Sequence, residues 1–251
     1  MRRNTRQDIV DAFILAVEQS SLSKLRIADL IAELGINRNT FYYHFSSKYD
    51  VALLVLCADL DSELRSALPE RNLIYCKFSE NELNKFPLAY YTHVETGART
   101  LDSSVFMRSF VHCTLKRPLF YRKLFSDDEL DFRQHLDTLY KPAVERDIEF
   151  ILDGRYMPPV TKRMLTQMAT RYISSVTRFC LKDCEGDLML DDRVNPFWNI
   201  IHESLYNAIQ THPINRYVSH SNGSIAKENE KTPPPRAGRD LFDGACRLGI
   251  A

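Results

Sequence analysis

The chain has 251 residues, 44% of them hydrophobic and 26% charged, so it can bury a substantial core and fits one small domain plus a larger one. Its 33 basic and 33 acidic side chains cancel, which excludes attraction to DNA through net charge alone. Its six cysteines are scattered without a CxxC pair, which is typical of free thiols in a reducing compartment.

Near the N-terminus, basic residues followed by an apolar run from Ile9 to Val17 superficially resemble a signal peptide. Asp11 interrupts the run and no A-x-A cleavage motif follows, so we interpret it as the first, amphipathic helix of a small domain. No apolar stretch approaches the about 20 residues that span a bilayer. The sequence therefore predicts a cytoplasmic protein without a membrane partner.

Two short helical patterns separated by a glycine follow. Apolar residues recur at helical spacing over Ile27 to Leu34. Gly35 comes next and can adopt the positive φ that a sharp reversal after a helix demands. Asn37 is a good N-cap for a second helix from about Arg38 to Phe45. Helix, glycine turn and helix at this spacing are typical of a helix-turn-helix that reads DNA.

The second helix separates its aromatic residues between two faces. At about 100° per residue, Phe41 and Phe45 share the inward face. Asn39 and Tyr43 then point away from the core, and Tyr42 lies on a shoulder. A helix of about eight residues is about 12 Å long, close to the width of the major groove of B-DNA. We therefore expect the outer side of this helix to enter that groove.

Local charge favours the same interpretation. No acidic residue occurs between Glu33 and Asp50, where Arg38, His44 and Lys48 lie. Lys48 follows Ser46-Ser47, either of which could cap the next helix, and a helix N-terminus also favours phosphate. A second basic cluster, Arg2-Arg3 with Arg6, is either an arm against the DNA or a disordered end.

The block from about Asn4 to Leu56 resembles the DNA-binding head of the TetR family of bacterial transcriptional regulators. The resemblance is carried by the helix before Gly35, the run Thr40-Phe41-Tyr42-Tyr43-His44-Phe45, and Lys48. It implies that Tyr42 and Lys48 bind DNA phosphates and that Arg38, Asn39 and Tyr43 face the bases. It also implies that Thr40 and His44 contact the DNA backbone or a base.

Three residues depart from the family pattern. Arg26 and Ile27 stand where the family often has Thr or Ser, and Arg26 could supply a phosphate contact of its own. Asn39 replaces a small residue and could pair bidentately with adenine. The predicted DNA-binding residues are Arg26, Asn37, Arg38, Asn39, Thr40, Tyr42, Tyr43, His44 and Lys48.

The rest of the chain reads as helical. A connecting helix is predicted from Ser47 to about Ser66, stopped by Pro69, and Leu73 to Phe78 could be a brief extended segment. Pro142 is expected to kink one of the later helices. These later helices are predicted over Leu88–Gly97, Ser103–Lys116, Leu119–Phe125, Glu129–Leu152, Thr161–Lys182 and Pro196–Thr211.

The predicted fold is therefore all-α, with an N-terminal three-helix helix-turn-helix head and a helical bundle for ligand binding and dimerisation. We place the head at residues 1–47, the bundle at 48–216 and a disordered tail at 217–251, where periodicity is lost.

The resemblance implies a repressor that binds a palindromic operator as a homodimer, through its last two helices, and is released by a small-molecule effector. An activator or coactivator without an effector pocket is the alternative. An enzyme is disfavoured because the chain has no Gly-rich phosphate loop, nucleophile elbow or metal-ligand spacing. We thus expect no catalytic residue, cofactor or metal.

Two further features stay open. Cys180 and Cys184, four apart on a predicted helix, are either packing thiols or a thiol sensor. The candidates for an effector pocket are aromatic or hydrogen-bonding residues within helical patterns, most of which are expected to serve packing or the surface instead. They are Tyr90, Tyr91, His93, Arg108, His112, Arg133 and Tyr140.

Overall fold

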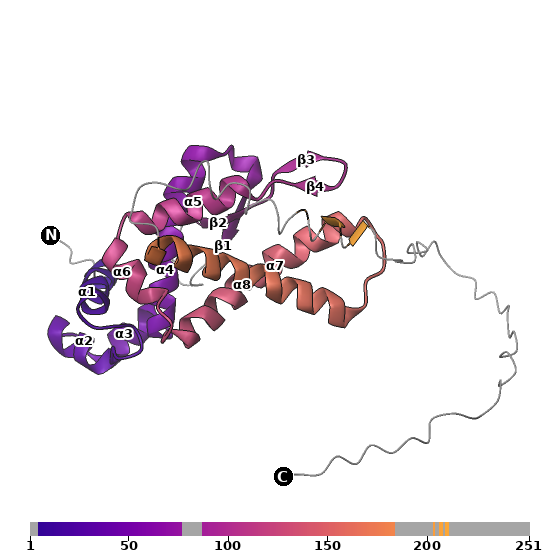
Figure 1. The fold of residues 1–251 in the computed structure, drawn as a ribbon. Coiled ribbons are helices and arrows are strands. Elements are labelled where there is room, and N and C mark those ends of the chain that lie inside the picture. The colour runs from indigo at the N-terminus through magenta and orange to yellow at the C-terminus, as the bar shows by residue number, and fades with distance from the viewer. Residues whose placement is uncertain (1–4, 77–86, 184–202, 204–205, 208, 211–251) are drawn as a thin grey trace, which may run out of the picture. The chain divides into compact units, whose positions relative to one another are not determined.

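The computed structural model describes residues 5–76, 87–183, 203, 206–207 and 209–210 (Figure 1). Residues 1–217 form one compact unit. Over the described part the chain is mostly helical, as predicted, with eight α-helices and four short strands. The predicted tail at 217–251 lies outside the described residues, and the predicted domain boundaries remain predictions.

The head (residues 1–47) has the three predicted helices: α1 Thr5–Gln19, α2 Ile27–Leu34 and α3 Arg38–His44. Gly35 follows α2 with φ 62°, the left-handed conformation that a residue with a Cβ adopts at a cost. The backbone N–H groups of Gly35 and Ile36 donate to the carbonyls of Ala32 and Ile31, both at 3.2 Å. The predicted glycine turn is therefore confirmed.

The connecting helix, α4 Lys48–Ala67, links the head to the body (residues 48–183). Ser47 is its N-cap and forms a capping box with Asp50, because each side chain bonds the other's backbone N–H, at 3.2 and 2.8 Å. The seven residues from Val51 to Cys57 are all buried, so this part of α4 is covered around its whole circumference. Figure 1 shows α4 running from the head into the centre of the body.

The predicted helix over Leu88–Gly97 is wrong. Strand β2, Leu88–Thr92, pairs antiparallel with β1, Leu73–Cys76, and strand β3, Glu95–Gly97, pairs with β4, Thr100–Leu101. A short run rich in aromatic and β-branched residues suits a buried strand as well as a helix, and pairing with β1 decides between them. The option of an extended segment near Leu73 is confirmed. A single 3₁₀ turn, Glu70–Asn72, precedes it.

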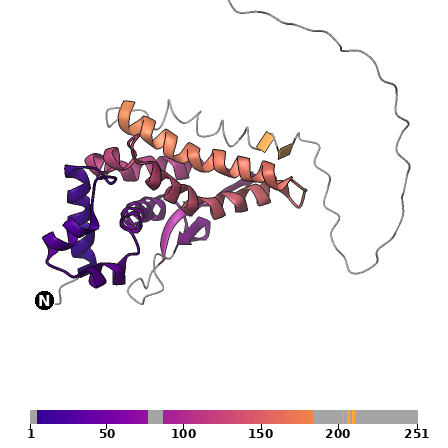
Figure 2. The same cartoon turned by 90° about the horizontal axis from the view of Figure 1, so that it is seen from below.

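The remaining helices are α5 Ser104–Leu115, α6 Pro118–Leu124, α7 Leu130–Leu152 and α8 Pro159–Asp183. They match four of the predicted helices closely, and Pro142 lies inside α7 without ending it. Figures 1 and 2 show α7 and α8 as a side-by-side pair. The predicted helix Pro196–Thr211 falls mostly outside the described residues.

The core is continuous from head to body. One cluster of buried apolar side chains includes Phe13 and Phe41 of the head and Phe106, Phe110 and Tyr140 of the body. Phe13 of α1 meets Phe120 of α6 edge to face, with ring centroids 6.2 Å apart. Because α1 packs on α6, a movement of α6 would displace α1 of the head.

Candidate nucleic-acid interface

Helix α3 presents its tyrosines to solvent. The exposed fraction is 60% for Tyr43 and 42% for Tyr42, whereas Phe41 between α3 and the core is 0% exposed. Arg38 and Asn39 are also exposed. The predicted division of this helix into an inward phenylalanine face and an outward polar face is therefore confirmed.

The N-terminal cap of α3 is built by Asn37. Its Oδ1 accepts a hydrogen bond from the backbone N–H of Thr40 at 2.7 Å and another from the Thr40 hydroxyl at 2.9 Å. The predicted N-cap is confirmed. Since this oxygen and the Thr40 hydroxyl proton are bonded to each other, both side chains fix the start of α3 before any DNA arrives.

Ring contacts hold the outer side chains of α3 in place. The Arg38 guanidinium lies 5.4 Å from the centroid of the Tyr42 ring, and Tyr42 meets Phe41 edge to face with centroids 5.4 Å apart. Tyr43 and His44 make a similar contact at 5.0 Å. These contacts keep a basic and a phenolic donor together on the surface that the sequence assigned to DNA.

His44 is half-buried and its charge is suppressed. Burial lowers the pKa of His44, and the positive charge of Arg6 lowers it further. Arg6 lies over the Phe45 ring, with 5.6 Å between guanidinium carbon and centroid, and burial lowers the pKa of Arg6 from its usual value. A neutral imidazole can donate one hydrogen bond to a phosphate but adds no charge at neutral pH.

Arg26 is engaged with a neighbour. Its Nε and Nη2 donate to the two carboxylate oxygens of Asp29, at 2.8 and 2.9 Å, on the exposed first turn of α2. Sequence reasoning did not pair these two residues, although a spacing of three on a helix is the signal for such a pair. A DNA phosphate at Arg26 would therefore compete with Asp29.

Lys48 has an internal role that the sequence did not reveal. Its Nζ donates to the backbone carbonyls of Leu22 at 2.6 Å, Ser23 at 3.1 Å and Leu25 at 3.1 Å, all in the loop between α1 and α2. Burial lowers the pKa of this half-buried ammonium. All three donors of the ammonium have partners, so Lys48 ties the helix-turn-helix loop to α4, and its phosphate contact remains a prediction.

The effector-pocket candidates do not form one site. Tyr90, Tyr91 and Tyr140 lie together in the core, with ring centroids 5.6 Å apart for Tyr90–Tyr140 and 6.0 Å for Tyr91–Tyr140. The others are scattered: His112 is near Glu63, Arg108 is exposed, and Arg133 bonds the Asp127 carbonyl.

A buried polar network, which sequence reasoning missed, joins two of these candidates through α7. The Tyr91 hydroxyl donates to Asp147 Oδ2 at 2.8 Å, and His93 Nδ1 lies 2.9 Å from Asp147 Oδ1. The hydrogen bond with Asp147 raises the pKa of His93. Asp147 lies more than fifty residues away along the chain, so nothing local in the sequence indicates the pairing.

The described residues offer neither a membrane-spanning helix nor a metal site. They contain no helix that is both long and apolar enough to cross a bilayer. Nor do they bring together three His, Cys, Asp or Glu side chains that could hold a metal ion.

Comparison with known proteins gives one sequence match. Residues 17–55 match the family described as bacterial regulatory proteins, tetR family. This segment contains the end of α1, α2, the glycine turn, α3 and the first turns of α4. No curated protein matches the chain.

Three solved structures show a distant likeness. A dihydroxyacetone kinase operon activator, DhaS, is 12% identical, covers 82% of this chain and 97% of its own, and has a TM-score of 0.42. The fatty acid degradation regulator FadR from Bacillus halodurans is 13% identical, with coverages of 82% and 96% and a TM-score of 0.38. A TetR family regulator from Chloroflexus aurantiacus is 13% identical, with coverages of 84% and 90% and a TM-score of 0.32.

TM-scores this low do not establish function, so the assignment rests on the sequence match together with the geometry of the head. The matched segment is the one that carries the capped α3, its outward tyrosines and the glycine turn. Residues 17–55 thus match the tetR family of bacterial regulatory proteins, and this match, together with the exposed polar face of α3, supports a DNA-binding transcriptional regulator.

Proposed function

We propose that this regulator is a repressor that binds a palindromic operator as a homodimer and is released by a small-molecule effector. The observation that carries the proposal is α3: four outward side chains, Arg38, Asn39, Tyr42 and Tyr43, stand on a helix fixed from behind by the buried Phe41. Such a helix fits the major groove, where its donors can contact base edges and phosphates. The proposal places the protein in the cytoplasm, with the chromosome, and assigns it no catalytic step.

An exposed apolar stripe on α8 supports the homodimer. Val160, Met164, Met168 and Phe179 are 64%, 58%, 63% and 54% exposed in the single chain. At about 100° per residue these four positions fall within one third of the helix circumference. A stripe of this kind is a frequent protein–protein interface, and a two-fold dimer would place two copies of α3 on two half-sites.

The aromatic core of the body supports an effector. The Tyr140 hydroxyl is buried without a hydrogen-bond partner in the described structure, and so is the Thr92 hydroxyl. A buried hydroxyl without a partner costs roughly 1–3 kcal/mol, which a ligand with a matching polar group would recover. The rings of Tyr90, Phe106 and Phe110 pack around Tyr140, so a flat or apolar effector would reach this hydroxyl by displacing one of them.

Selection of bound duplexes from a random pool tests DNA recognition and symmetry together. We expect the full chain to select an inverted repeat, and Tyr43→Ala to weaken binding to it by about tenfold. Tyr156→Ala is the matched control, because Tyr156 is also exposed, at 48%, but follows α7 in the body. Selection of no sequence, or equal losses for both variants, would contradict the assigned groove-facing role of α3.

A reporter for the genes next to the regulator separates repression from activation. Deletion of the regulator is expected to raise their expression, whereas deletion of an activator would lower it.

Light scattering tests the dimer: Met168→Glu should increase the monomer fraction. Leu130→Glu, at an equally exposed position outside the stripe, should not. A monomeric parent chain would refute the homodimer.

A further inference from the structure

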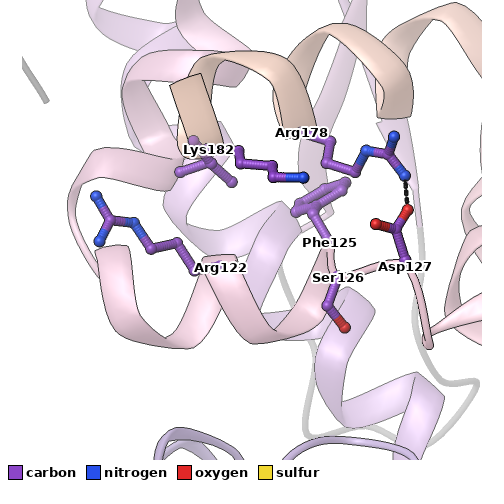
Figure 3. A pocket seen from close by; sticks show the side chains of 7 residues that line it. Arg122, Phe125, Ser126, Asp127, Arg178 and Lys182 are labelled. Carbon is purple, nitrogen blue, oxygen red and sulfur yellow. Dashed lines mark hydrogen bonds and ion pairs between the residues drawn. The ribbon is translucent and has the colours of Figure 1, made fainter. Parts of the chain in front are cut away.

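A pocket with an excess of positive charge lies where α6 and α8 meet. This junction pocket has a volume of about 430 Å³, within the range of small-molecule sites. Arg122 comes from α6, Phe125 and Asp127 from the turn after it, and Arg178, Leu181 and Lys182 from the last two turns of α8. Figure 3 shows Lys182 extended above the Phe125 ring toward Arg178, whereas the Arg122 side chain extends away from the ring.

The charges of the junction pocket are not balanced within it. Three cationic side chains and one carboxylate line the pocket, and Arg178 pairs with that carboxylate, Asp127 (Figure 3). Among the described residues, Arg122 and Lys182 have no hydrogen-bond or ion-pair partner. Cations are common at the C-terminal ends of helices, where they complement the helix dipole. The helix dipole explains why cationic side chains occur at the ends of α6 and α8. It does not explain the pocket between the two helices, which Phe125 and Leu181 line.

The turn that lines the junction pocket also holds the head. Glu129, 1% exposed, accepts a hydrogen bond from the backbone N–H of Ser23 in the α1–α2 loop at 2.7 Å. Asp131 accepts one from the Tyr49 hydroxyl of α4 at 2.9 Å. The backbone carbonyl of Asp127 itself accepts from Arg133 Nη2 at 2.7 Å. Asp127 therefore lies two residues from a direct contact with the helix-turn-helix.

We propose that the junction pocket binds a small organic anion, whose carboxylate or phosphate group lies beside Lys182 and Arg178 and whose apolar part lies on Phe125 and Leu181. An anion there competes with Asp127 for Arg178, shifts the turn that follows α6, and changes the Ser23–Glu129 contact. This second step, control of DNA affinity, rests on the proposed function, whereas anion binding does not. The site is separate from the aromatic core around Tyr140.

Calorimetry on the full chain tests the binding step with defined probes: benzoate, phenyl phosphate and the neutral benzamide. We expect one anion per chain, and binding of benzamide weaker by about tenfold or more. Comparison of benzoate with phenyl phosphate identifies the preferred anionic group. Lys182→Gln and Arg178→Gln should each weaken anion binding by about tenfold.

The control is Lys123→Gln, which removes one exposed charge from the last turn of α6 outside the pocket. Unchanged thermal unfolding of the three variants confirms that they fold. The proposal is overturned if neither anion binds at millimolar concentration, if benzamide binds as well as benzoate, or if Lys123→Gln weakens binding as much as Lys182→Gln.

Hydrogen exchange of the Ser23 amide tests the coupling. Saturating anion should change its exchange rate several-fold in the parent chain and leave it unchanged in Lys182→Gln, because this amide proton is the one donated to Glu129. Anion binding without a change at Ser23 would refute the coupling. Anion binding by a chain that selects no operator would refute the proposed function and leave the anion site standing.

Discussion

In the head, the side chains that shape α2 and α3 bond neighbours three residues away, as Asn37 does with Thr40 and Arg26 with Asp29. In the body, two bonds between buried or partly buried side chains cross long stretches of chain. Tyr91 and Asp147 are 56 residues apart, and Tyr121 and Asp59 are 62 apart, at 2.8 and 2.7 Å. The helices of the head are thus shaped by local bonds and present an exposed polar face on α3, whereas the body also uses long-range polar bonds to fix its packing.

Phe41→Ala should have the largest effect on stability, because it removes a side chain from the buried apolar core that the head and the body share. Phe41 is 0% exposed, and truncation of such a residue costs about 3–5 kcal/mol of unfolding free energy. Urea unfolding followed by circular dichroism measures it. Tyr43→Ala on the same helix should change stability by no more than about 0.5 kcal/mol. Similar losses for the two variants would show that α3 is not divided into two faces.

Asp147→Ala tests the long-range bonding of the body. It leaves the buried Tyr91 hydroxyl without its acceptor, and we expect a loss of about 2–3 kcal/mol in urea unfolding. Tyr91→Phe removes that hydroxyl, so the ring then needs no acceptor. The double variant with both substitutions should therefore lose less than the two single changes summed. Strict additivity would refute the network.

The same network predicts a pH dependence. Asp147 raises the pKa of His93 above its usual value of 6.5, so the folded state favours the protonated imidazole. Its contribution to stability is fully present below pH 6.5 and is lost as the pH rises through the raised pKa of the folded state. Urea midpoints across this pH range should therefore show this loss in the parent chain and not in His93→Gln. A parallel pH profile in the variant would exclude His93 as the cause.

Lys48→Met sharpens the boundary between the two regions, because Lys48 begins α4 but bonds the loop of the head. Loss of its three carbonyl bonds should cost about 2 kcal/mol. If Lys48 acts within the protein alone, operator binding by the folded variant keeps the salt dependence of the parent. If it also binds phosphate, the slope of log K against log salt falls by about 1.

Asn37→Ala should have the smallest effect, about 1 kcal/mol, from loss of the N-cap of α3. Asn39→Ala, two positions along and exposed, should leave stability unchanged while it alters the preferred operator bases. An unchanged base preference in Asn39→Ala would remove the adenine contact predicted for this residue.

The same contrast explains which parts of the structure were predictable. The glycine turn, the Asn37 cap and the phenylalanine spacing depend on signals within a few residues, and the structure confirms them. Local periodicity predicts a helix at strand β2, because the strand depends on pairing with β1, which lies more than ten residues earlier in the chain.

In the candidate interface, outward placement of the tyrosines followed from the sequence, but the engagement of individual polar groups did not. Whether Lys48 faces DNA or the protein depends on where three carbonyls of another loop lie, and only the folded chain determines that. The pairing of Arg26 with Asp29 is predictable from the sequence, because a spacing of three residues on a helix is a local signal.

The division of α3 into a buried and an exposed side has an evolutionary consequence. Substitutions at Asn39 or Tyr43 leave the packing around Phe41 intact. Single mutations at these positions can therefore change the preferred DNA sequence without lowering the free energy of unfolding. The seven-residue helix α3 can therefore change its DNA-facing residues while the residues that pack against the core stay the same.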